Sequence, residues 1–137
     1  MRLAFLALLS NDVPVAARFW REARLLPQTY YDESIGYAAF ETGNPGVTLS
    51  IVSRAILPAL TGKATQEQAP TARQMYLSFL VDAVDTTYAQ VINQGARPIS
   101  QPTDHPERQS RLAHFSDPAD NLIEIYQPLR PAGESAE

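Results

Sequence analysis

Cysteine is absent from the 137 residues of the chain, and lysine occurs once, at Lys63. The absence of cysteine excludes disulfides, thiolate nucleophiles and thiolate metal sites, but it leaves the redox compartment open. The other cationic residues are arginines scattered without a basic stripe, and the formal net charge is −4. Because a surface that follows phosphates needs clustered positive charge, the sequence predicts no nucleic-acid partner.

Long apolar runs are also missing. The apolar stretch near the N-terminus, residues 3–9, is too short to span a bilayer and lacks a small-residue cleavage signal. It is typical of a buried strand, so we expect a cytoplasmic protein that does not associate with membranes. With 45% hydrophobic residues, the chain can form one compact domain or two fused half-domains.

Two stretches of the chain begin alike. Residues 5–13 read FLALLSNDV and residues 76–84 read YLSFLVDAV, so each predicts a strand, an acidic turn and a helix. The first helix has Asp12 as its expected N-cap and Pro14 in its first turn. In the second, Asp82 or Asp85 is the expected cap, and Gly95 ends the helix as a left-handed residue.

Both predicted helices carry an apolar stripe at helical spacing. Trp20, beside Phe19, is expected in the core. The predicted buried positions are Val15, Ala16, Phe19, Trp20 and Ala23 in the first helix, and Val84, Tyr88, Val91 and Ile92 in the second.

Three short strand-like runs follow each helix, so the pattern is β-α-β-β-β, twice. We expect an α+β fold in which two βαβββ modules form a curved mixed sheet around a groove. The predicted runs are residues 28–32, 35–42 and 46–53, then 99–103, 112–116 and 122–127. The predicted boundaries are 1–53 for the first module, 54–73 for a linker, 74–128 for the second module and 129–137 for a flexible tail.

The segment from Asp117 to Glu124 carries the most specific pattern in the chain. Asp117-Pro118 sets up a turn, and Asp120-Asn121 can supply a left-handed position. Glu124 then stands alone among apolar residues in the last strand. A carboxylate there either faces a ligand or points to solvent at a sheet edge.

This segment, Asp-Pro-Ala-Asp-Asn-Leu-Ile-Glu, resembles the Asp-Pro-x-Gly-Asn-x-Ile-Glu pattern of the vicinal oxygen chelate superfamily. That superfamily includes glyoxalase I, extradiol dioxygenases, fosfomycin-modifying enzymes and bleomycin-resistance proteins. Asp12-Val13 followed by residues 17–20, ARFW, resembles the family's first helix. The chain departs from the pattern at Asp120, which replaces the usual turn glycine but tolerates left-handed geometry better than most residues.

The resemblance implies four cleft positions that hold a metal in the catalytic members. They fall at Phe5, near Leu49, at Tyr76 and at Glu124. Only Glu124 could bind a divalent cation, and one carboxylate does not hold a catalytic metal. We therefore expect no metal and no other cofactor, and no residue is assigned a catalytic role.

Aromatic side chains at two of these positions predict a groove in which a planar ligand stacks. By alternation Ser78 shares a face with Tyr76, and Tyr126 shares one with Glu124. His114 lines the cleft or satisfies a partner behind the sheet, whereas His105 is expected in a solvated, turn-rich loop. The predicted ligand-binding residues are Phe5, Ala7, Leu49, Tyr76, Ser78, His114, Glu124 and Tyr126. The alternative for the aromatic set is ordinary sheet core.

The function we expect is non-catalytic sequestration of a small planar hydrophobic molecule, as the drug-resistance members do with antibiotics. The resemblance also implies a homodimer, with exchange of modules between chains left open. One alternative is a divergent enzyme of the same superfamily, an isomerase, lyase or dioxygenase, with His114 or Glu124 as its base. Another is a partner domain with no small ligand.

Overall fold

The computed structural model describes residues 2–56 and 75–130 of the chain. The chain divides into two compact units, Met1–Ala72 and Arg73–Glu137, which we call the first and the second module. Residues 57–73 of the predicted linker and residues 131–137 of the predicted tail lie outside the described residues. Within the described residues, no helix is long and apolar enough to cross a membrane.

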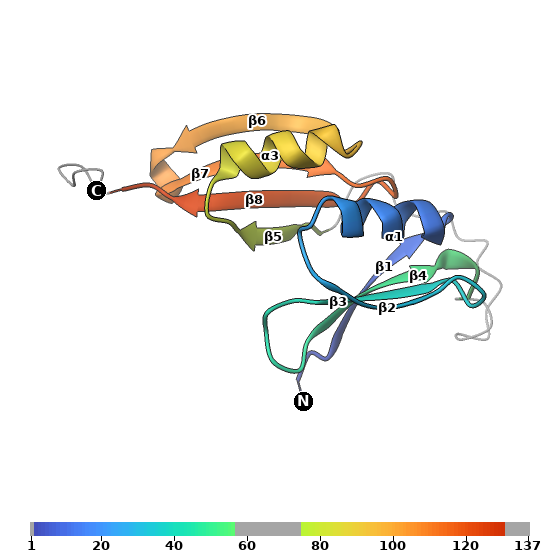
Figure 1. Ribbon diagram of the computed structural model, residues 1–137. Helices are drawn as coiled ribbons and strands as arrows, with labels where there is room; N and C mark the ends of the chain where they lie inside the picture. Colours follow the sequence, from blue (N-terminus) through green and yellow to red (C-terminus); the bar gives the residue numbers. More distant parts are fainter. Residues whose placement is uncertain (1, 57–74, 131–137) are drawn as a thin grey trace. The chain divides into compact units, whose positions relative to one another are not determined.

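The first module is a four-stranded sheet with one helix (Figure 1). Its sheet has the order β1-β4-β3-β2, in which β1 is parallel to β4 and the other neighbours are antiparallel. The elements are β1 (Phe5–Ser10), α1 (Val13–Glu22), β2 (Gln28–Asp32), β3 (Tyr37–Glu41), β4 (Thr48–Ser53) and the 3₁₀ turn η1 (Arg54–Ile56).

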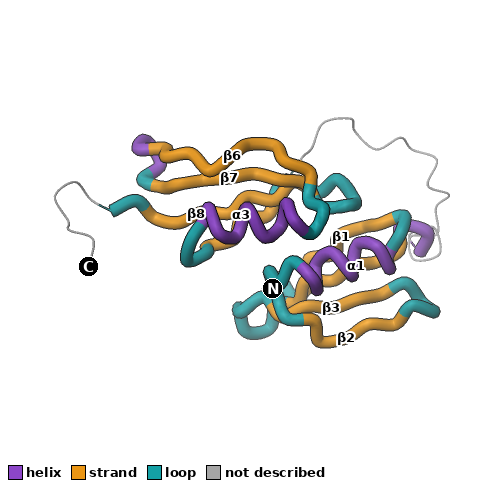
Figure 2. Tube along the Cα trace, turned by 45° about the horizontal axis from the view of Figure 1, so that its top comes forward, coloured by secondary structure: helices purple, strands orange, loops and turns teal. Residues whose placement is uncertain are grey.

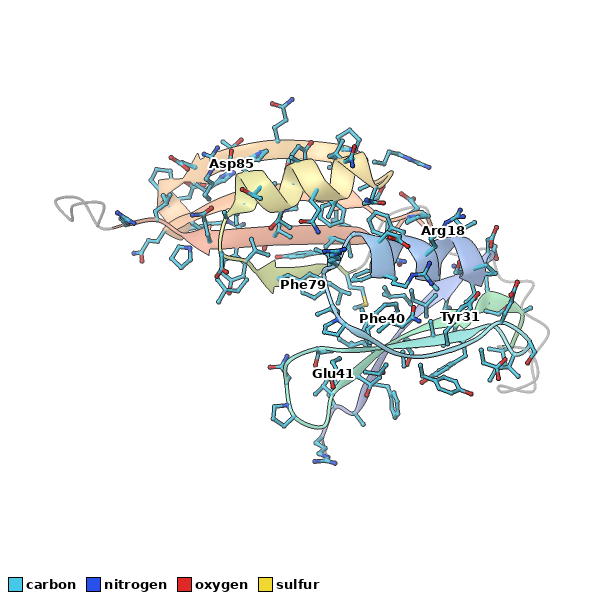
Figure 3. All side chains as sticks on the ribbon, viewed as in Figure 1. Arg18, Tyr31, Phe40, Glu41, Phe79 and Asp85 are labelled. Carbon is cyan, nitrogen blue, oxygen red and sulfur yellow. The ribbon has the colours of Figure 1, made fainter. Side chains whose placement is uncertain are left out.

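Helix α1 begins as the sequence predicts. The Asp12 carboxylate accepts a hydrogen bond from the Val15 N–H at 3.2 Å, and Pro14 lies in the first turn. Trp20 is fully buried, and its ring centroid lies 6.2 Å from that of Phe40, which points from β3 toward α1 in Figure 3. The prediction that Val15 is buried is wrong, because the buried line starts at Val13 and Val15 falls on the exposed side of the helix.

The second module repeats this topology. Its sheet has the order β5-β8-β7-β6, with β5 parallel to β8, and Figure 2 shows α3 running along the sheet beside β8. The elements are β5 (Leu77–Leu80), α3 (Val84–Asn93), β6 (Arg97–His105), the 3₁₀ turn η2 (Pro106–Arg108), β7 (Ser110–Ser116) and β8 (Leu122–Pro128). The predicted α+β fold of two βαβββ modules is therefore confirmed.

Helix α3 begins differently from the prediction. Its N-cap is Ala83, with no side-chain cap, so neither Asp82 nor Asp85 has that role. The Val84 N–H instead donates to the Gln127 Oε1 at 2.7 Å, a partner supplied by β8. Within the predicted stripe, Val84 and Val91 are buried, whereas Tyr88 and Ile92 are half-buried. Gly95 follows the helix with φ +101°, as predicted.

The turn between β7 and β8 is built around Asp117, which is 2% exposed. Its Oδ1 accepts from the backbone N–H of Ala119 at 3.0 Å and of Asn121 at 2.8 Å, and the Asn121 amide donates to both carboxylate oxygens. Asp120 has φ +64°, the left-handed conformation expected there. This turn fixes the register of β7 against β8 and so places Glu124 opposite His114.

Candidate functional site

Four polar side chains stand side by side across the second sheet, one from each strand. Strand pairing places Ser78 of β5 opposite Glu124 of β8, Glu124 opposite His114 of β7, and His114 opposite Ser100 of β6. Their neighbours along β7 and β8, among them Phe115 and Ile123, are fully buried on the helix side of the sheet. The four residues therefore lie on the face away from α3, and we call them the Glu124 row.

Hydrogen bonds join the Glu124 row from end to end. The Ser78 hydroxyl donates to Glu124 Oε1 at 2.6 Å. His114 Nε2 lies 2.9 Å from Glu124 Oε2, and His114 Nδ1 lies 2.6 Å from the Ser100 hydroxyl oxygen. The carboxylate and the imidazole are thus each held from two sides, which fixes their orientation.

The Glu124 carboxylate accepts from the Ser78 hydroxyl and can accept from the Nε2–H of His114. The hydroxyl of Ser100 can donate to His114 Nδ1 or accept from it, so it bonds either form of the ring. The side chain of Glu124 is 10% exposed and that of His114 is 25% exposed. Because a carboxylate offers about four lone-pair sites, Glu124 can still accept a hydrogen bond from a ligand.

A hollow of about 350 Å³ opens onto the Glu124 row, within the second module. This volume is at the small end of the range for ligand pockets, so it suits a molecule of one or two rings. Glu124 and His114 border the hollow, and Tyr76, Leu112 and Leu122 give it apolar walls. The remaining lining residues, His105, Glu107 and Arg108, come from the connection between β6 and β7.

That connection has a defined conformation. His105 is half-buried at the end of β6, and its Nδ1 lies 3.1 Å from Glu107 Oε1. The pKa of Glu107 is lowered, first by a hydrogen bond from its own backbone N–H and then by the bond with His105. The expectation that His105 lies in a loop is therefore wrong, because β6 continues to His105; its side chain is 37% exposed, as a solvated histidine would be, and it borders the hollow.

The structure brings part of the predicted site together. Tyr76, His114 and Glu124 line the hollow, and Ser78 is hydrogen-bonded to Glu124. Tyr126 is half-buried two residues beyond Glu124 in β8, on the same face of the strand.

The other predicted residues belong to the first module. Phe5 is 61% exposed and Ala7 is exposed, and both lie on the face of β1 that points away from the helix-covered core. Leu49 is 1% exposed and pairs with Leu6, so it belongs to the core; its place in the predicted groove was one residue out of register. Ser50, which pairs with Ala7, takes the position expected for Leu49.

The first module has a row equivalent to the Glu124 row. Pairing aligns Ala7 of β1, Ser50 of β4, Ala39 of β3 and Tyr30 of β2, and we call these residues the Ser50 row. Ser50 stands where the second module has Glu124, and its hydroxyl lies 3.1 Å from that of Tyr37. The Ser50 row contains no carboxylate and no imidazole.

Sequence reasoning missed Ser100, Leu112, Leu122 and Arg108. Alternation from His114 and Glu124 would have indicated Leu112 and Leu122, since each is two residues away on the same strand. Ser100 could not be found in this way, because the register of β6 against β7 shifts on both sides of it.

The donor set does not fit a catalytic metal. Within residues 2–56 and 75–130, no group of three or more His, Asp or Glu residues is placed to hold a metal ion. Glu124 and His114 supply two donors that are engaged with each other, whereas a catalytic metal takes about three protein ligands. Ser50 and Ala7 add no strong ligand in the equivalent row.

These features define the class of the protein. A model of the glyoxalase-like domain family matches residues 5–126, and the chain belongs to this family. It is 32% identical, over 130 residues, to the uncharacterized protein YraH of Bacillus subtilis, with 94% of this chain and all of that protein covered.

Solved structures share the fold. A glyoxalase/bleomycin resistance protein/dioxygenase from Nocardioides superposes with a TM-score of 0.73 and 21% identity, covering all of this chain and 89% of the other. A glyoxalase/bleomycin resistance protein/dioxygenase family enzyme from Burkholderia phytofirmans gives 0.77 and 19%, with 94% and 100% covered. TioX from a Micromonospora species gives 0.64 and 17%, with 94% and 100% covered.

Proposed function

We propose that the second module binds a small, partly aromatic molecule in the hollow beside Glu124, and that the protein sequesters this molecule without transforming it. The observation that carries the proposal is the composition of the hollow. Apolar walls from Tyr76, Leu112 and Leu122 meet the carboxylate of Glu124, which is held by Ser78 and His114, while Glu107 and Arg108 border the hollow from the connection between β6 and β7. Mostly apolar walls with few convergent polar groups are typical of small-molecule sites, because the walls supply affinity and the polar groups orient the ligand.

Tyr76 contributes most to this proposal. Its side chain is 49% exposed while it borders the hollow, so one face of the ring is available to an aromatic ligand. Glu124 would accept a hydrogen bond from an amine, amide or hydroxyl of that ligand. A glyoxalase/bleomycin resistance protein/dioxygenase from Nocardioides shares the fold, which supports an antibiotic or a similar toxic compound as the molecule that is held.

Sequestration is tested best by NMR, because the single tryptophan, Trp20, is fully buried in the first module and does not line the hollow. A panel of aromatic antibiotics is titrated into ¹⁵N-labelled protein. We expect the largest shifts at Tyr76, Leu112 and Leu122 and an unchanged ligand spectrum after prolonged incubation. Conversion of a ligand, or shifts from no compound, would contradict the proposal.

Two variants localise the binding. Tyr76→Ala should weaken affinity by about 1–3 kcal/mol, on the scale of aromatic stacking. Tyr30→Ala is the matched control, since Tyr30 is 52% exposed on the sheet of the first module. Equal losses in both variants would show that the ligand does not stack in the hollow.

The Glu124 row favours a second candidate, acid–base catalysis without a metal. Glu124, oriented by Ser78 and His114, has the geometry of a general base that removes a proton from an acidic C–H bond of a carbonyl compound. The electron pair of that bond would pass to the carbonyl as an enolate, which the protonated Glu124 would quench. Ser100 would hold the His114 ring in place through Nδ1.

Deuterium exchange separates the two candidates. Small 2-oxo acids and 2-hydroxy ketones are incubated with the protein in D₂O, and loss of the C–H signal is followed by NMR. A catalyst would exchange the proton, Glu124→Gln would abolish exchange, and Glu41→Gln, a change at an exposed carboxylate of the first module, would not. Sequestration predicts no protein-dependent exchange for any variant.

We propose further that the protein is a homodimer. Strand β1 has a single hydrogen-bonded neighbour in its sheet, and Phe5 on it is 61% exposed. Such an edge favours association with another chain. Sedimentation equilibrium should give twice the mass of the chain, and Phe5→Glu should shift the protein toward the monomer.

A further inference from the structure

Arg108 is a cation at the border of the hollow, and its charge acts on the adjacent carboxylate of Glu107. It lies in η2 and lines the hollow together with Leu112, Leu122 and Tyr76. The described ion pairs do not include it. Glu107, its neighbour in sequence and in the lining of the hollow, is hydrogen-bonded to His105, and the charge of Arg108 also contributes to the lowered pKa of Glu107.

The other arginine of this hairpin shows the contrast. Arg111 donates to both oxygens of Asp85 and to Asp104, each at 2.8 Å, so its charge is matched by two carboxylates. Arg111 is thus engaged by two carboxylates, whereas Arg108, three residues before it, borders the hollow and makes no side-chain hydrogen bond among the described residues. This division leaves Arg108 available to a ligand.

The backbone around Arg108 is held firmly. Its carbonyl accepts from the Ser110 hydroxyl at 3.1 Å. Gln109 has φ +53°, its N–H donates to the Pro106 carbonyl at 3.0 Å, and its carbonyl accepts from the Leu129 N–H at 2.9 Å. The guanidinium therefore extends from a fixed point, which favours recognition of one ligand group at one place.

The polar groups of the hollow are separated along the sheet. His114 lies four positions beyond Ser110, which is next to η2, and this corresponds to a length of about 13 Å in an extended strand. Leu112 lies between them and borders the hollow. A ligand in the hollow thus meets a hydrogen-bond acceptor at Glu124, apolar walls, and at the other end Arg108 beside the Glu107–His105 pair.

We propose that the ligand is an aromatic carboxylic acid with a hydrogen-bond donor at its far end, whose carboxylate pairs with Arg108 while the donor reaches Glu124. This inference rests on the proposed binding function. Arginine suits the role because its planar guanidinium binds a carboxylate through two parallel hydrogen bonds. Arg108 is then the residue that selects acids over their neutral analogues.

Matched probes test this selection. The probes are 4-hydroxyphenylacetate, its methyl ester, and phenylacetate, titrated by NMR together with the antibiotic panel. Wild-type protein should bind the acid about tenfold more tightly than the ester, as expected for a charge-assisted pair. Arg108→Gln should remove this difference, and Arg97→Gln, at an exposed arginine of the same hairpin, should keep it. Phenylacetate should bind more weakly than 4-hydroxyphenylacetate, and Glu124→Gln should remove that difference.

The outcomes separate the inference from the function on which it rests. Equal affinity for acid and ester in wild-type protein overturns the inference and leaves binding in the hollow intact. An acid preference that survives Arg108→Gln overturns it as well. If neither these probes nor any member of the panel binds at millimolar concentration, the proposed function and the inference fall together.

Discussion

The two modules share one topology but carry different chemistry on corresponding strands. In the second module the row reads Ser78, Glu124, His114, Ser100, and in the first it reads Ala7, Ser50, Ala39, Tyr30. The Glu124 row is a continuous chain of hydrogen bonds between ionisable and hydroxyl groups. The Ser50 row contains no side chain that is ionised at neutral pH, and three of its four residues are small. The two modules therefore offer the same four positions across their sheets, and the side chains at these positions give the two sheets different chemistry.

Burial explains why the difference is stable. Ser50 is 2% exposed and Ala39 6% exposed, so the first module has little room and no counter-charge for a carboxylate at this place. Glu124 is 7% exposed as well, but His114 and Ser78 compensate the loss of solvent. A buried carboxylate is tolerated where its partners are present, because an unpaired one costs several kcal/mol.

The largest effect is expected from placing the carboxylate in the wrong module. Ser50→Glu should lower the free energy of unfolding by about 3–5 kcal/mol, because it buries a larger, charged side chain beside the Tyr37 hydroxyl, with no imidazole in its row. Urea denaturation followed by circular dichroism measures the loss. Adding Ala39→His should recover part of it, by about 1 kcal/mol, if a neighbouring imidazole is what the position needs. A Ser50→Glu protein as stable as the wild type would refute this account.

Removing the imidazole from the second module should have the next largest effect. His114→Ala leaves Glu124 buried with only Ser78 as a partner, which should cost about 2 kcal/mol of unfolding free energy. The same denaturation experiment applies. Loss of a similar amount in His105→Ala, where the histidine pairs with an exposed glutamate, would show that pairing with Glu124 is not the cause.

A smaller effect is expected at the end of the row. Ser100→Ala removes the partner of His114 Nδ1 and should cost about 1 kcal/mol. Ser50→Ala, which removes one hydroxyl bond in the first module, is the matched control. The ¹⁵N shifts of His114 are the more specific measurement: they should change in Ser100→Ala and stay the same in Ser50→Ala.

The smallest effect concerns acid stability, and both modules should show it. The pKa of Asp85 is lowered from 3.8, first by the Arg111 hydrogen bond, and that of Asp32 is lowered from 3.8, first by the Ser34 hydrogen bond. A carboxyl whose pKa is lower in the folded state than in the unfolded state stabilises the fold at any pH above its unfolded-state pKa. This contribution is lost as the pH falls through the lowered pKa of the folded state.

Asp85→Asn and Asp32→Asn should therefore each be less stable than wild type at neutral pH. Each should approach the wild type below about pH 4, where the ordinary carboxyl becomes protonated. Thermal melts across this pH range measure the convergence. A constant difference from neutral to acidic pH would rule out the ionic contribution of that carboxylate.

Much of the fold follows from local sequence. Asp12 caps α1, Gly95 ends α3, and Asp117 with Asp120 builds the turn before β8, each by an interaction within a few residues. The repeat of strand and helix signals gave the two modules. The cap of α3 could not be predicted from local patterns, because its first N–H donates to the side chain of Gln127, which is 43 residues away in sequence.

The candidate site divides in the same way. Tyr76, Glu124 and His114 were found from the motif and from alternation along the strands. Leu49 was misplaced because a shift of one residue moves a side chain to the other face of a sheet. Ser100 was missed because the irregular pairing of β6 breaks simple alternation.

The sequence by itself determined the order of helices and strands and identified Glu124 as the carboxylate of the candidate site, because turns, caps and the periodicity of strands are local properties of the chain. Only the tertiary structure decided what surrounds that carboxylate. Ser78 and His114 lie 46 and 10 residues from Glu124 in sequence, and Ser100 lies 14 residues from His114. Strand pairing brings these residues side by side although they are far apart in sequence. The partners that keep Glu124 buried and oriented are therefore in place only when the sheet has formed.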